Sequence, residues 1–209
     1  YEIMNEVAWD YIPFTSEMKS IAKQTSAVCF GSLAQRSEIT RNTINMFLDE
    51  MLPEIGLYKI FDINLRKHFY TKDIIDNSLT RCNVLKINDD ELNKVCKMFN
   101  YGGNNLKEKA MTLLDNYDLD ILILTCGVNG SYIFTPDTWS FVDTPRVEVK
   151  DTVGAGDSFT AAFISALLYN KDIYFAHNFA VEVSAYVCTQ NGAMPILPQA
   201  LVDKIKNNI

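Results

Sequence analysis

The residues best suited to chemistry form a turn of small residues, Asp151-Thr152-Val153-Gly154-Ala155-Gly156-Asp157-Ser158-Phe159, that runs directly into an amphipathic helix. The start of a helix leaves backbone N–H groups unpaired and carries partial positive charge, and glycine lets the backbone approach an anion closely. Such a turn can hold a phosphate or a developing phosphoryl charge. The structural alternative is that Gly154 and Gly156 only shape a tight turn, with Asp157 as a first-turn acid favoured by the helix dipole.

Several other kinds of site are disfavoured or excluded. A dinucleotide-binding fingerprint would need a small residue at position 159, where Phe159 stands, and no GxxxxGK[ST] phosphate-binding loop occurs. The five cysteines are scattered and never form a CxxC pair, which suggests neither a zinc site nor a disulfide framework. His68 and His177 lack metal-ligand neighbours, so we interpret both as structural or surface residues.

Composition favours a globular protein that acts on a small molecule. The chain has 209 residues, of which 48% are hydrophobic and 22% are charged, so it can build one sizeable core. Its net charge of −7 argues against nucleic-acid and membrane partners, because both are polyanionic. No apolar run approaches the roughly 20 residues of a membrane span, and we expect a cytoplasmic protein with reduced thiols. Because the chain begins at Tyr1 with no start signal, we also expect that an N-terminal part is missing.

Short apolar runs alternate with segments of helical periodicity, a pattern typical of an α/β fold with a mostly parallel sheet. Helices are predicted where apolar residues recur every three or four positions, around Ile39–Met51 and Leu92–Phe99. Two consecutive helices, around Phe159–Leu167 and Ala176–Val187, are expected to close the chain. The expected strands are Ala27–Phe30, Tyr58–Ile63, Val84–Ile87, Ile121–Thr125 and Ser131–Phe134.

The run DTVGAGDSF closely resembles the second signature of the ribokinase, or PfkB, carbohydrate kinases. The resemblance implies that Asp157 is the catalytic base and that the backbone N–H groups of Gly154, Ala155 and Gly156 form an anion hole. An aspartate beside helix-terminal amides can accept a hydroxyl proton as the hydroxyl attacks a phosphate, and phosphoryl transfer otherwise needs positioning and charge stabilisation. The implied fold is a ribokinase-like three-layer α/β/α sandwich. It would form one domain over residues 1–209, without the N-terminal lid and first signature.

Asn88-Asp89-Asp90-Glu91 follows a predicted strand and looks like the family's NxxE motif. The resemblance implies that Asn88 and Glu91 handle phosphate and magnesium. An Asn N-cap with Glu three residues later is also a capping box, and in isolation the motif favours that structural interpretation.

Two glycine-bearing loops resemble nucleotide loops of the family. Thr125-Cys126-Gly127-Val128-Asn129-Gly130 is similar to its TxGxxG loop, although an ordinary turn between two strands fits equally well. The closing loop Cys188–Pro195 resembles the segment beside the adenine, although a helix ending in Asn-Gly needs no ligand. The implied nucleotide-binding residues are Thr125, Gly127, Gly130 and Asn191, and the implied monovalent-cation (K⁺) residues are Asp151, Val153, Gln190 and Gly192.

Two further stretches bear on the substrate. Phe61–Arg66 resembles the DxNxR segment of sugar kinases, which implies that Asn64 and Arg66 face substrate or phosphate; a turn-forming Asn and a surface Arg are the simpler alternative. The stretch VCFGSLAQR, Val28–Arg36, resembles fructokinase-like members most.

The implied activity is an ATP- and magnesium-dependent transfer of the γ-phosphoryl group to a sugar hydroxyl, with fructose as the expected acceptor. Ribose, 2-keto-3-deoxygluconate and nucleosides remain alternative acceptors. A non-catalytic nucleotide- or sugar-sensing module is an alternative of another class, whereas an oxidoreductase is disfavoured by Phe159. The resemblance also implies a homodimer as one possible assembly, formed through the lid region that we expect to be missing. Since a lid excludes water and completes the site, the chain by itself is expected to lack efficient activity.

Overall fold

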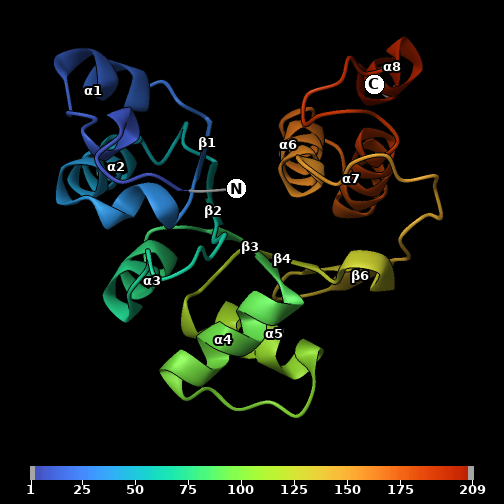
Figure 1. Ribbon diagram of the computed structural model, residues 1–209, viewed down its shortest axis with the longest axis horizontal. Helices are drawn as coiled ribbons and strands as arrows, with labels where there is room; N and C mark the ends of the chain where they lie inside the picture. Colours follow the sequence, from blue (N-terminus) through green and yellow to red (C-terminus); the bar gives the residue numbers. More distant parts are fainter. Residues whose placement is uncertain (1–2, 207–209) are drawn as a thin grey trace. The chain divides into compact units, whose positions relative to one another are not determined.

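Six strands form one sheet within residues 3–206, which are the residues that the computed structural model describes (Figure 1). The strands lie in sequence order across the sheet: β1 (Ala27–Phe30), β2 (Tyr58–Asp62), β3 (Val84–Asn88), β4 (Ile121–Thr125), β5 (Ser131–Phe134) and β6 (Trp139–Val142). The pairs β1–β2 and β2–β3 are parallel, and β5–β6 is antiparallel. The predicted α/β class with a mostly parallel sheet is confirmed. By its internal contacts the chain divides into two compact parts, unit 1 (Tyr1–Ile123) and unit 2 (Leu124–Ile209).

All five predicted strands are present with ends that differ by at most one residue, but β6 was not predicted. Its four residues give a short signal, and two of its aromatic side chains, Trp139 and Phe141, are exposed at 48% and 39%. The residue that β6 buries is the polar Ser140. Hydrophobic alternation therefore could not reveal this strand, because its buried position is not apolar.

Unit 1 contains the helices α1 (Ser16–Ala22), α2 (Glu38–Glu50), α3 (Lys72–Leu79), α4 (Asp89–Phe99) and α5 (Leu106–Asn116), with the 3₁₀ turns η1 (Ala8–Asp10) and η2 (Leu33–Arg36). Within this unit α1 packs on α2, and α4 packs on α5 (Figure 1). Four of the helices start at a residue whose side chain accepts a first-turn N–H: Thr15, Thr71, Asn88 and Asn105. These caps explain where the helices begin.

The helix predicted around Ile39–Met51 is α2, but its buried face is partly polar. Ile39 is 48% exposed, whereas Thr40 and Thr43 are buried. The Thr40 hydroxyl donates to the Trp9 carbonyl oxygen at 2.7 Å, and the Thr43 hydroxyl donates to that of Ile12 at 2.6 Å. Helix α2 thus holds the segment before α1 by hydrogen bonds.

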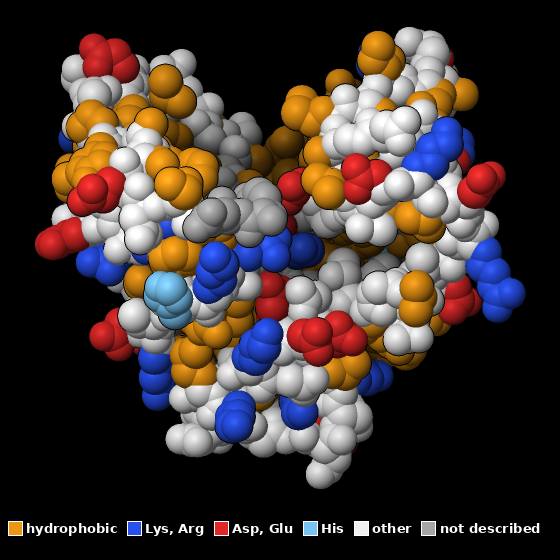
Figure 2. Space-filling view, in the orientation of Figure 1, with side chains coloured by type: hydrophobic (Ala, Val, Ile, Leu, Met, Phe, Trp, Pro, Cys, Tyr) orange, Lys and Arg blue, Asp and Glu red, His pale blue; other side chains and the backbone are white. Residues whose placement is uncertain are grey.

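Apolar side chains are exposed around α1 and α2 and on the segment that follows α2, and Figure 2 shows hydrophobic groups at the surface of this part. They are Ile21, Ile39, Met46, Leu52, Ile55 and Leu57. No helix in the described range combines the length and the apolar character needed to cross a bilayer.

Unit 2 contains α6 (Ala155–Leu168), α7 (Ile173–Cys188), α8 (Gln199–Lys206) and the 3₁₀ turn η3 (Gly127–Asn129). Helix α6 packs on α7, and α7 packs on β5 and β6. The expectation that two helices close the chain is wrong, because α8 follows them. Its eight residues bury only Leu201 and Ile205, one turn apart, which is too little periodicity to detect in the sequence.

His177 connects α7 to both strands of the β5–β6 pair. Its side chain is fully buried, with Nε2 2.8 Å from the Ser131 hydroxyl and Nδ1 2.9 Å from the Ser140 hydroxyl. Its ring and that of Phe159 make an edge-to-face contact, with their centroids 6.1 Å apart. Burial lowers the pKa of His177 to about 4, since the charged imidazolium would lose its hydration there. The histidine is therefore a neutral structural residue.

The low pKa of His177 predicts that unit 2 loses stability in mild acid. In the unfolded chain histidine protonates near pH 6.5, but in the folded state only near pH 4. Between these values the unfolded state binds the extra proton, so the free energy of unfolding falls by about 3 kcal/mol as the pH drops.

The measurement is urea unfolding at a series of pH values between 7 and 4. The His177→Gln variant should lose this part of the pH dependence, whereas His68→Gln, a change at an exposed histidine, should retain it. If the free energy of unfolding of His177→Gln fell with pH as steeply as that of the unmodified protein, His177 would not be the source of the pH dependence.

Candidate active site

Helix α6 begins without the side-chain cap found at its neighbour α7. The N-cap of α7 is Asp172, whose carboxylate accepts the N–H groups of Tyr174 and Phe175. The N-cap of α6 is Gly154, which has no side chain to offer. Among the described residues, the N–H groups of Gly156 and Asp157 have no acceptor. Two donors at a positive helix end are thus open to an anion.

Packing explains why a glycine stands at position 154. Its φ is 81°, in the left-handed region, and a Cβ there would lie 2.7 Å from the carbonyl oxygen of Ala193. A side chain at this position would therefore collide with the backbone of the loop after α7. The glycine that leaves the helix uncapped is required by the close approach of that loop.

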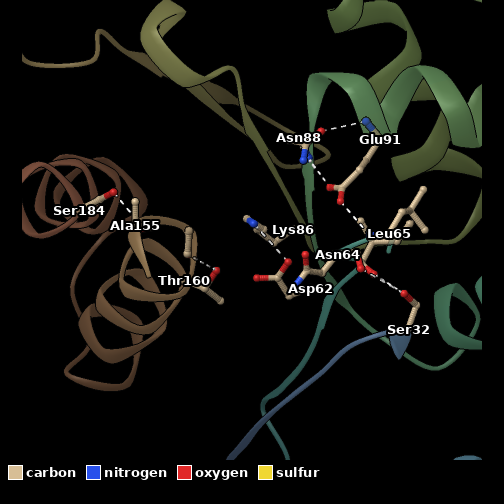
Figure 3. Close-up of polar contacts among 12 residues, drawn as sticks. Ser32, Asp62, Asn64, Leu65, Lys86, Asn88, Glu91, Ala155, Thr160 and Ser184 are labelled. Carbon is tan, nitrogen blue, oxygen red and sulfur yellow. Dashed lines mark hydrogen bonds and ion pairs between the residues drawn. The ribbon is translucent and has the colours of Figure 1, made fainter. Parts of the chain in front are cut away.

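Hydroxyl groups hold the first turn of α6 through its carbonyls (Figure 3). The Ala155 carbonyl oxygen accepts the hydroxyls of Ser158 and Ser184, each at 2.9 Å, and the Gly156 carbonyl oxygen accepts that of Thr160 at 3.1 Å. Sequence reasoning did not find Ser184, because it lies on α7 and belongs to no motif.

Asp157 lies in the first turn of α6 with its side chain exposed. No hydrogen bond joins its carboxylate to the rest of the described chain. Its own N–H is one of the two open donors. A solvent-accessible carboxylate and an anion-binding helix end therefore share one turn.

Asp151 joins the strand-to-helix segment to the loop that follows α7. Its carboxylate accepts the N–H of Val153 at 3.0 Å and that of Gly192 at 3.3 Å, and its own N–H donates to the Cys188 carbonyl oxygen. Burial, and secondarily the Asp151 charge, raise the pKa of the Cys188 thiol. Asp151, Val153 and Gly192, three of the four residues predicted for a monovalent-cation site, are thus joined by hydrogen bonds to the Asp151 carboxylate. The side chain of the fourth, Gln190, donates to the Thr189 hydroxyl instead.

Both glycines of the Thr125–Gly130 loop adopt backbone conformations that favour glycine. Gly127 and Gly130 have φ values of 55° and 92°, and a Cβ at Gly130 would lie 2.7 Å from the Val142 carbonyl oxygen. The Thr144 hydroxyl braces the loop by donating to the Gly127 carbonyl oxygen and accepting the Gly130 N–H. Val128 at its tip is 86% exposed.

In unit 1, Glu91 connects the start of α4 to the segment after β2 (Figure 3). It is 5% exposed, and its two carboxylate oxygens accept the N–H groups of Leu65 and Asn88 at 2.9 Å and 3.1 Å. The Asn88 side chain in turn accepts the Glu91 N–H at 2.9 Å. The capping box is therefore present, and Glu91 has an additional partner outside its helix.

Ser32 holds the same segment from the other side. Its hydroxyl donates to the Ile63 carbonyl oxygen at 2.7 Å. Between these two anchors Asn64 adopts a φ of 43°, in the left-handed region. Arg66, two residues further on, is exposed. The structure thus fixes Asn64 tightly and leaves Arg66 at the surface.

Residues that could bind magnesium are sparse. Within the described part of the chain, no group of three or more His, Cys, Asp and Glu side chains is placed so that it could hold a metal ion. Magnesium usually keeps several waters and is held by one or two carboxylates together with substrate phosphates. Glu91 fits such a role only through lone pairs left over from its two backbone contacts, so magnesium would depend mainly on the nucleotide.

A buried ion pair escaped the sequence analysis. Lys86 on β3 lies opposite Asp62 on β2, and its Nζ is 3.2 Å from the Asp62 Oδ1. Both side chains are 11% exposed. A lysine inside the apolar run Val84–Ile87 was the available signal, because charged residues are seldom buried without a reason.

The GSLAQR stretch is used for packing within unit 1. Arg36 makes two hydrogen bonds to the Asp10 carboxylate, at 2.8 Å and 2.7 Å, and its guanidinium contacts the rings of Trp9 and Phe69. The hydrogen bond from Arg36 lowers the pKa of Asp10. These contacts account for the presence of Arg36 without a role in sugar binding. The Val28–Arg36 stretch is therefore weak evidence for the identity of the substrate.

Comparison with known proteins identifies the family. Residues 22–200 match the family described as pfkB family carbohydrate kinase. The chain belongs to the pfkB family of carbohydrate kinases. The match covers the Gly154–Asp157 turn, the Asn88–Glu91 motif and the Thr125–Gly130 loop.

Curated relatives of this pfkB-family chain act on different substrates. It is 28% identical to fructokinase-2 from Solanum habrochaites over 183 residues, which cover 82% of the chain and 54% of that protein. It is 25% identical to a nucleoside kinase from Methanothermobacter thermautotrophicus, over 75% of the chain and 48% of that protein. The chain therefore spans about half the length of these relatives.

The fold agrees with solved structures of the family. A fructokinase from Vibrio cholerae O395 with bound fructose, ADP and potassium ion matches with a TM-score of 0.73 at 24% identity, over 85% of this chain and 59% of that one. The predicted ribokinase-like α/β/α fold is confirmed.

The contacts of Glu91 predict a structural effect of its substitution. Glu91→Gln replaces one accepting oxygen by an NH₂ group that faces a backbone N–H, so the free energy of unfolding should fall by about 1–3 kcal/mol. Urea unfolding without nucleotide or magnesium measures this loss. Glu108→Gln is the matched control, since Glu108 occupies the same position of α5 but is exposed. Equal losses in the two variants would contradict the role of burial.

The clash at Gly154 predicts a second difference in stability. Gly154→Ala and Gly192→Ala both place alanine in the left-handed region, at φ values of 81° and 79°, which costs about 1–2 kcal/mol. Only at Gly154 would the new Cβ meet backbone, because nothing lies within 4 Å of one at Gly192. Thermal unfolding should show the larger loss for Gly154→Ala. A similar loss in both variants would disprove the close approach.

Proposed function

We propose that this protein transfers the γ-phosphoryl group of ATP to a hydroxyl of a sugar, with fructose as the acceptor. The observation that carries the proposal is the start of α6, where the exposed Asp157 carboxylate lies in the same turn as the open N–H groups of Gly156 and Asp157. The proposed base and the proposed anion site are thereby held together by one helix turn. Membership of the pfkB family supports the class of reaction.

In the proposed reaction Asp157 accepts the proton of the sugar hydroxyl as its oxygen attacks the γ-phosphorus. The backbone N–H groups of Gly154, Ala155 and Gly156 are proposed to donate hydrogen bonds to the phosphoryl oxygens, whose charge the helix dipole also favours. Of these, the Ala155 N–H donates to the Thr152 carbonyl oxygen at 3.3 Å in the structure and would have to exchange that acceptor for a phosphoryl oxygen. Ser184, Ser158 and Thr160 keep these peptide groups in place through the carbonyls of the turn. A magnesium ion bound with the nucleotide would neutralise phosphate charge.

The nucleotide is assigned to the two glycine loops, through Thr125, Gly127, Gly130 and Asn191. Val128 and Met194, which are 86% and 95% exposed, offer apolar surface on these loops against which the adenine ring of the nucleotide could pack. Asn88 and Glu91 are proposed to act on phosphate and magnesium, and Asn64 and Arg66 on substrate or phosphate.

Four further features remain proposals. We propose a potassium site around Asp151, with Val153, Gln190 and Gly192, supported by the potassium-bound fructokinase of V. cholerae. The single domain over residues 1–209, the cytoplasmic location and the homodimer through a lid are proposed on the family pattern.

The proposal predicts ADP release that depends on ATP, magnesium and a sugar. The assay measures ADP release by the full-length protein in the presence of fructose, ribose, 2-keto-3-deoxygluconate or a nucleoside. Release with fructose alone would support both the reaction and the acceptor. Release with another compound would overturn only the choice of fructose. ATP binding with no release for any acceptor would favour a sensing module.

Asp157→Asn should lower turnover by about 10²- to 10⁴-fold while ATP binding persists, because the amide cannot accept the hydroxyl proton. Asp137→Asn is the control, since Asp137 is exposed in the turn between β5 and β6. Undiminished turnover in Asp157→Asn would reject the assigned base.

A further inference from the structure

Ser184 on α7 donates a hydrogen bond to the first turn of α6 (Figure 3). Its hydroxyl lies 2.9 Å from the Ala155 carbonyl oxygen. A hydroxyl inside a helix can donate to the carbonyl four residues earlier in its own helix, as Thr160 does to Gly156 in α6. Ser184 instead donates to a different helix, so its hydrogen bond is a tertiary contact at the candidate active site.

The carbonyl that Ser184 contacts and one of the open donors are the two ends of a single peptide group. The Ala155 carbonyl oxygen accepts the hydroxyls of Ser158 and Ser184, and the N–H of the same peptide group is that of Gly156, which has no acceptor among the described residues. In an α-helix the N–H groups point toward the N-terminus and the carbonyls toward the C-terminus. The two hydroxyls therefore lie behind a donor that faces the open end of α6.

A hydrogen bond to the carbonyl of a peptide group acts on the N–H of that group in two ways. It draws electron density toward the oxygen, and such linked hydrogen bonds strengthen one another by about 10–30% per bond. It also fixes the orientation of the peptide plane, so the N–H is aimed before an anion arrives. Donors that are oriented in advance stabilise a developing negative charge without a cost of reorganisation.

Packing alone accounts for the size of Ser184 but not for its hydroxyl. Ala176, Ala180 and Ser184 follow one another at steps of four along α7, and the two alanines are fully buried. Residues at this spacing share one face of a helix. Alanine at position 184 would continue the series of small side chains without a polar group. The hydroxyl is the part of the residue that reaches the Ala155 carbonyl oxygen.

We propose that Ser184 is a positioning residue that orients and polarises the Gly156 N–H for the phosphoryl group during its transfer. This inference rests on the proposed kinase function, in which the start of α6 stabilises the charge of that group. Ser184 does not touch the substrate and acts through the peptide group between Ala155 and Gly156. Helix α7 thereby contributes to the strength of the proposed anion site.

The test compares three substitutions of Ser184 in the full-length protein. Ser184→Ala removes the hydroxyl, Ser184→Cys keeps a side chain of similar size that is only a weak donor, and Ser184→Thr retains the hydroxyl. Ser165→Ala is the matched control, since Ser165 is an exposed serine of α6. Steady-state kinetics with ATP, magnesium and the best acceptor from the sugar assay give kcat and the KM for ATP.

Ser184→Ala and Ser184→Cys should lower kcat by about 3- to 10-fold, which is the range for the loss of one neutral hydrogen bond. The KM for ATP should stay the same, because the affected donor acts mainly in the transition state. Ser184→Thr should restore kcat, and Ser165→Ala should leave it unchanged.

A second measurement does not depend on turnover. In ¹⁵N-labelled protein the Gly156 nitrogen resonance should move upfield in Ser184→Ala and Ser184→Cys, because less electron density is drawn from that peptide group. The resonances of Tyr174 and Phe175, in the capped first turn of α7, should not move. Titration with inorganic phosphate, followed at Gly156, should show weaker binding in these two variants than in Ser184→Thr.

A kcat of Ser184→Ala equal to that of Ser165→Ala would overturn the inference and leave the proposed function standing. The same loss of kcat in Ser184→Thr would also overturn it, because the effect would then come from packing, and so would a Gly156 resonance that does not move. Unmodified full-length protein without turnover would overturn the proposed function instead. The Gly156 resonance and the phosphate titration would then decide whether Ser184 strengthens this donor toward an anion.

Discussion

The approach of the loop after α7 to the backbone at Gly154 is the constraint on which the candidate site depends. With 2.7 Å between a Cβ and the Ala193 carbonyl oxygen, no side chain fits, and the left-handed φ favours glycine for the same position. The residues that could cap α6 are thereby excluded, because Ser, Thr, Asp and Asn all carry a Cβ. The open N–H groups beside Asp157 are therefore a consequence of a packing contact.

In unit 1 a different constraint acts, because one buried carboxylate holds two segments of the chain together. Glu91 completes the capping box of α4 and also binds the Leu65 N–H, while Ser32 holds the preceding carbonyl. The segment around Asn64 is fixed from both sides before any ligand arrives. The structural and functional interpretations of the NxxE motif are thus compatible, since a rigid loop is what a phosphate-binding edge requires.

Local signals in the sequence predicted most of the fold. Apolar runs found β1 to β5, and the spacing of Leu92, Val95 and Cys96 found α4, because these three residues lie on its buried face. Strand β6 and helix α8 were missed, since the one buries a serine and the other only two apolar residues. Their existence depends on neighbours that a local pattern does not contain.

The site was predictable where one segment carries it and not where two segments must meet. The Gly154–Asp157 turn is contiguous, so its motif sufficed. The pairing of Asp62 with Lys86, and of Ser184 with the Ala155 carbonyl, joins residues that are 24 and 29 positions apart. No spacing rule links such pairs, because the strand register and the packing of α6 on α7 create them.

The uncapped end of α6 also has a consequence for how the protein responds to its ligand. A side-chain cap is typically worth about 1 kcal/mol to a helix, and α6 lacks that contribution. An anion bound at Gly156 and Asp157 would replace it, so occupancy and local order at this turn are thermodynamically linked. The missing cap that opens the site thereby makes the order of the first turn of α6 depend on whether a ligand is bound. Added ligand would slow amide hydrogen exchange at this turn and leave the exchange in the capped first turn of α7 unchanged.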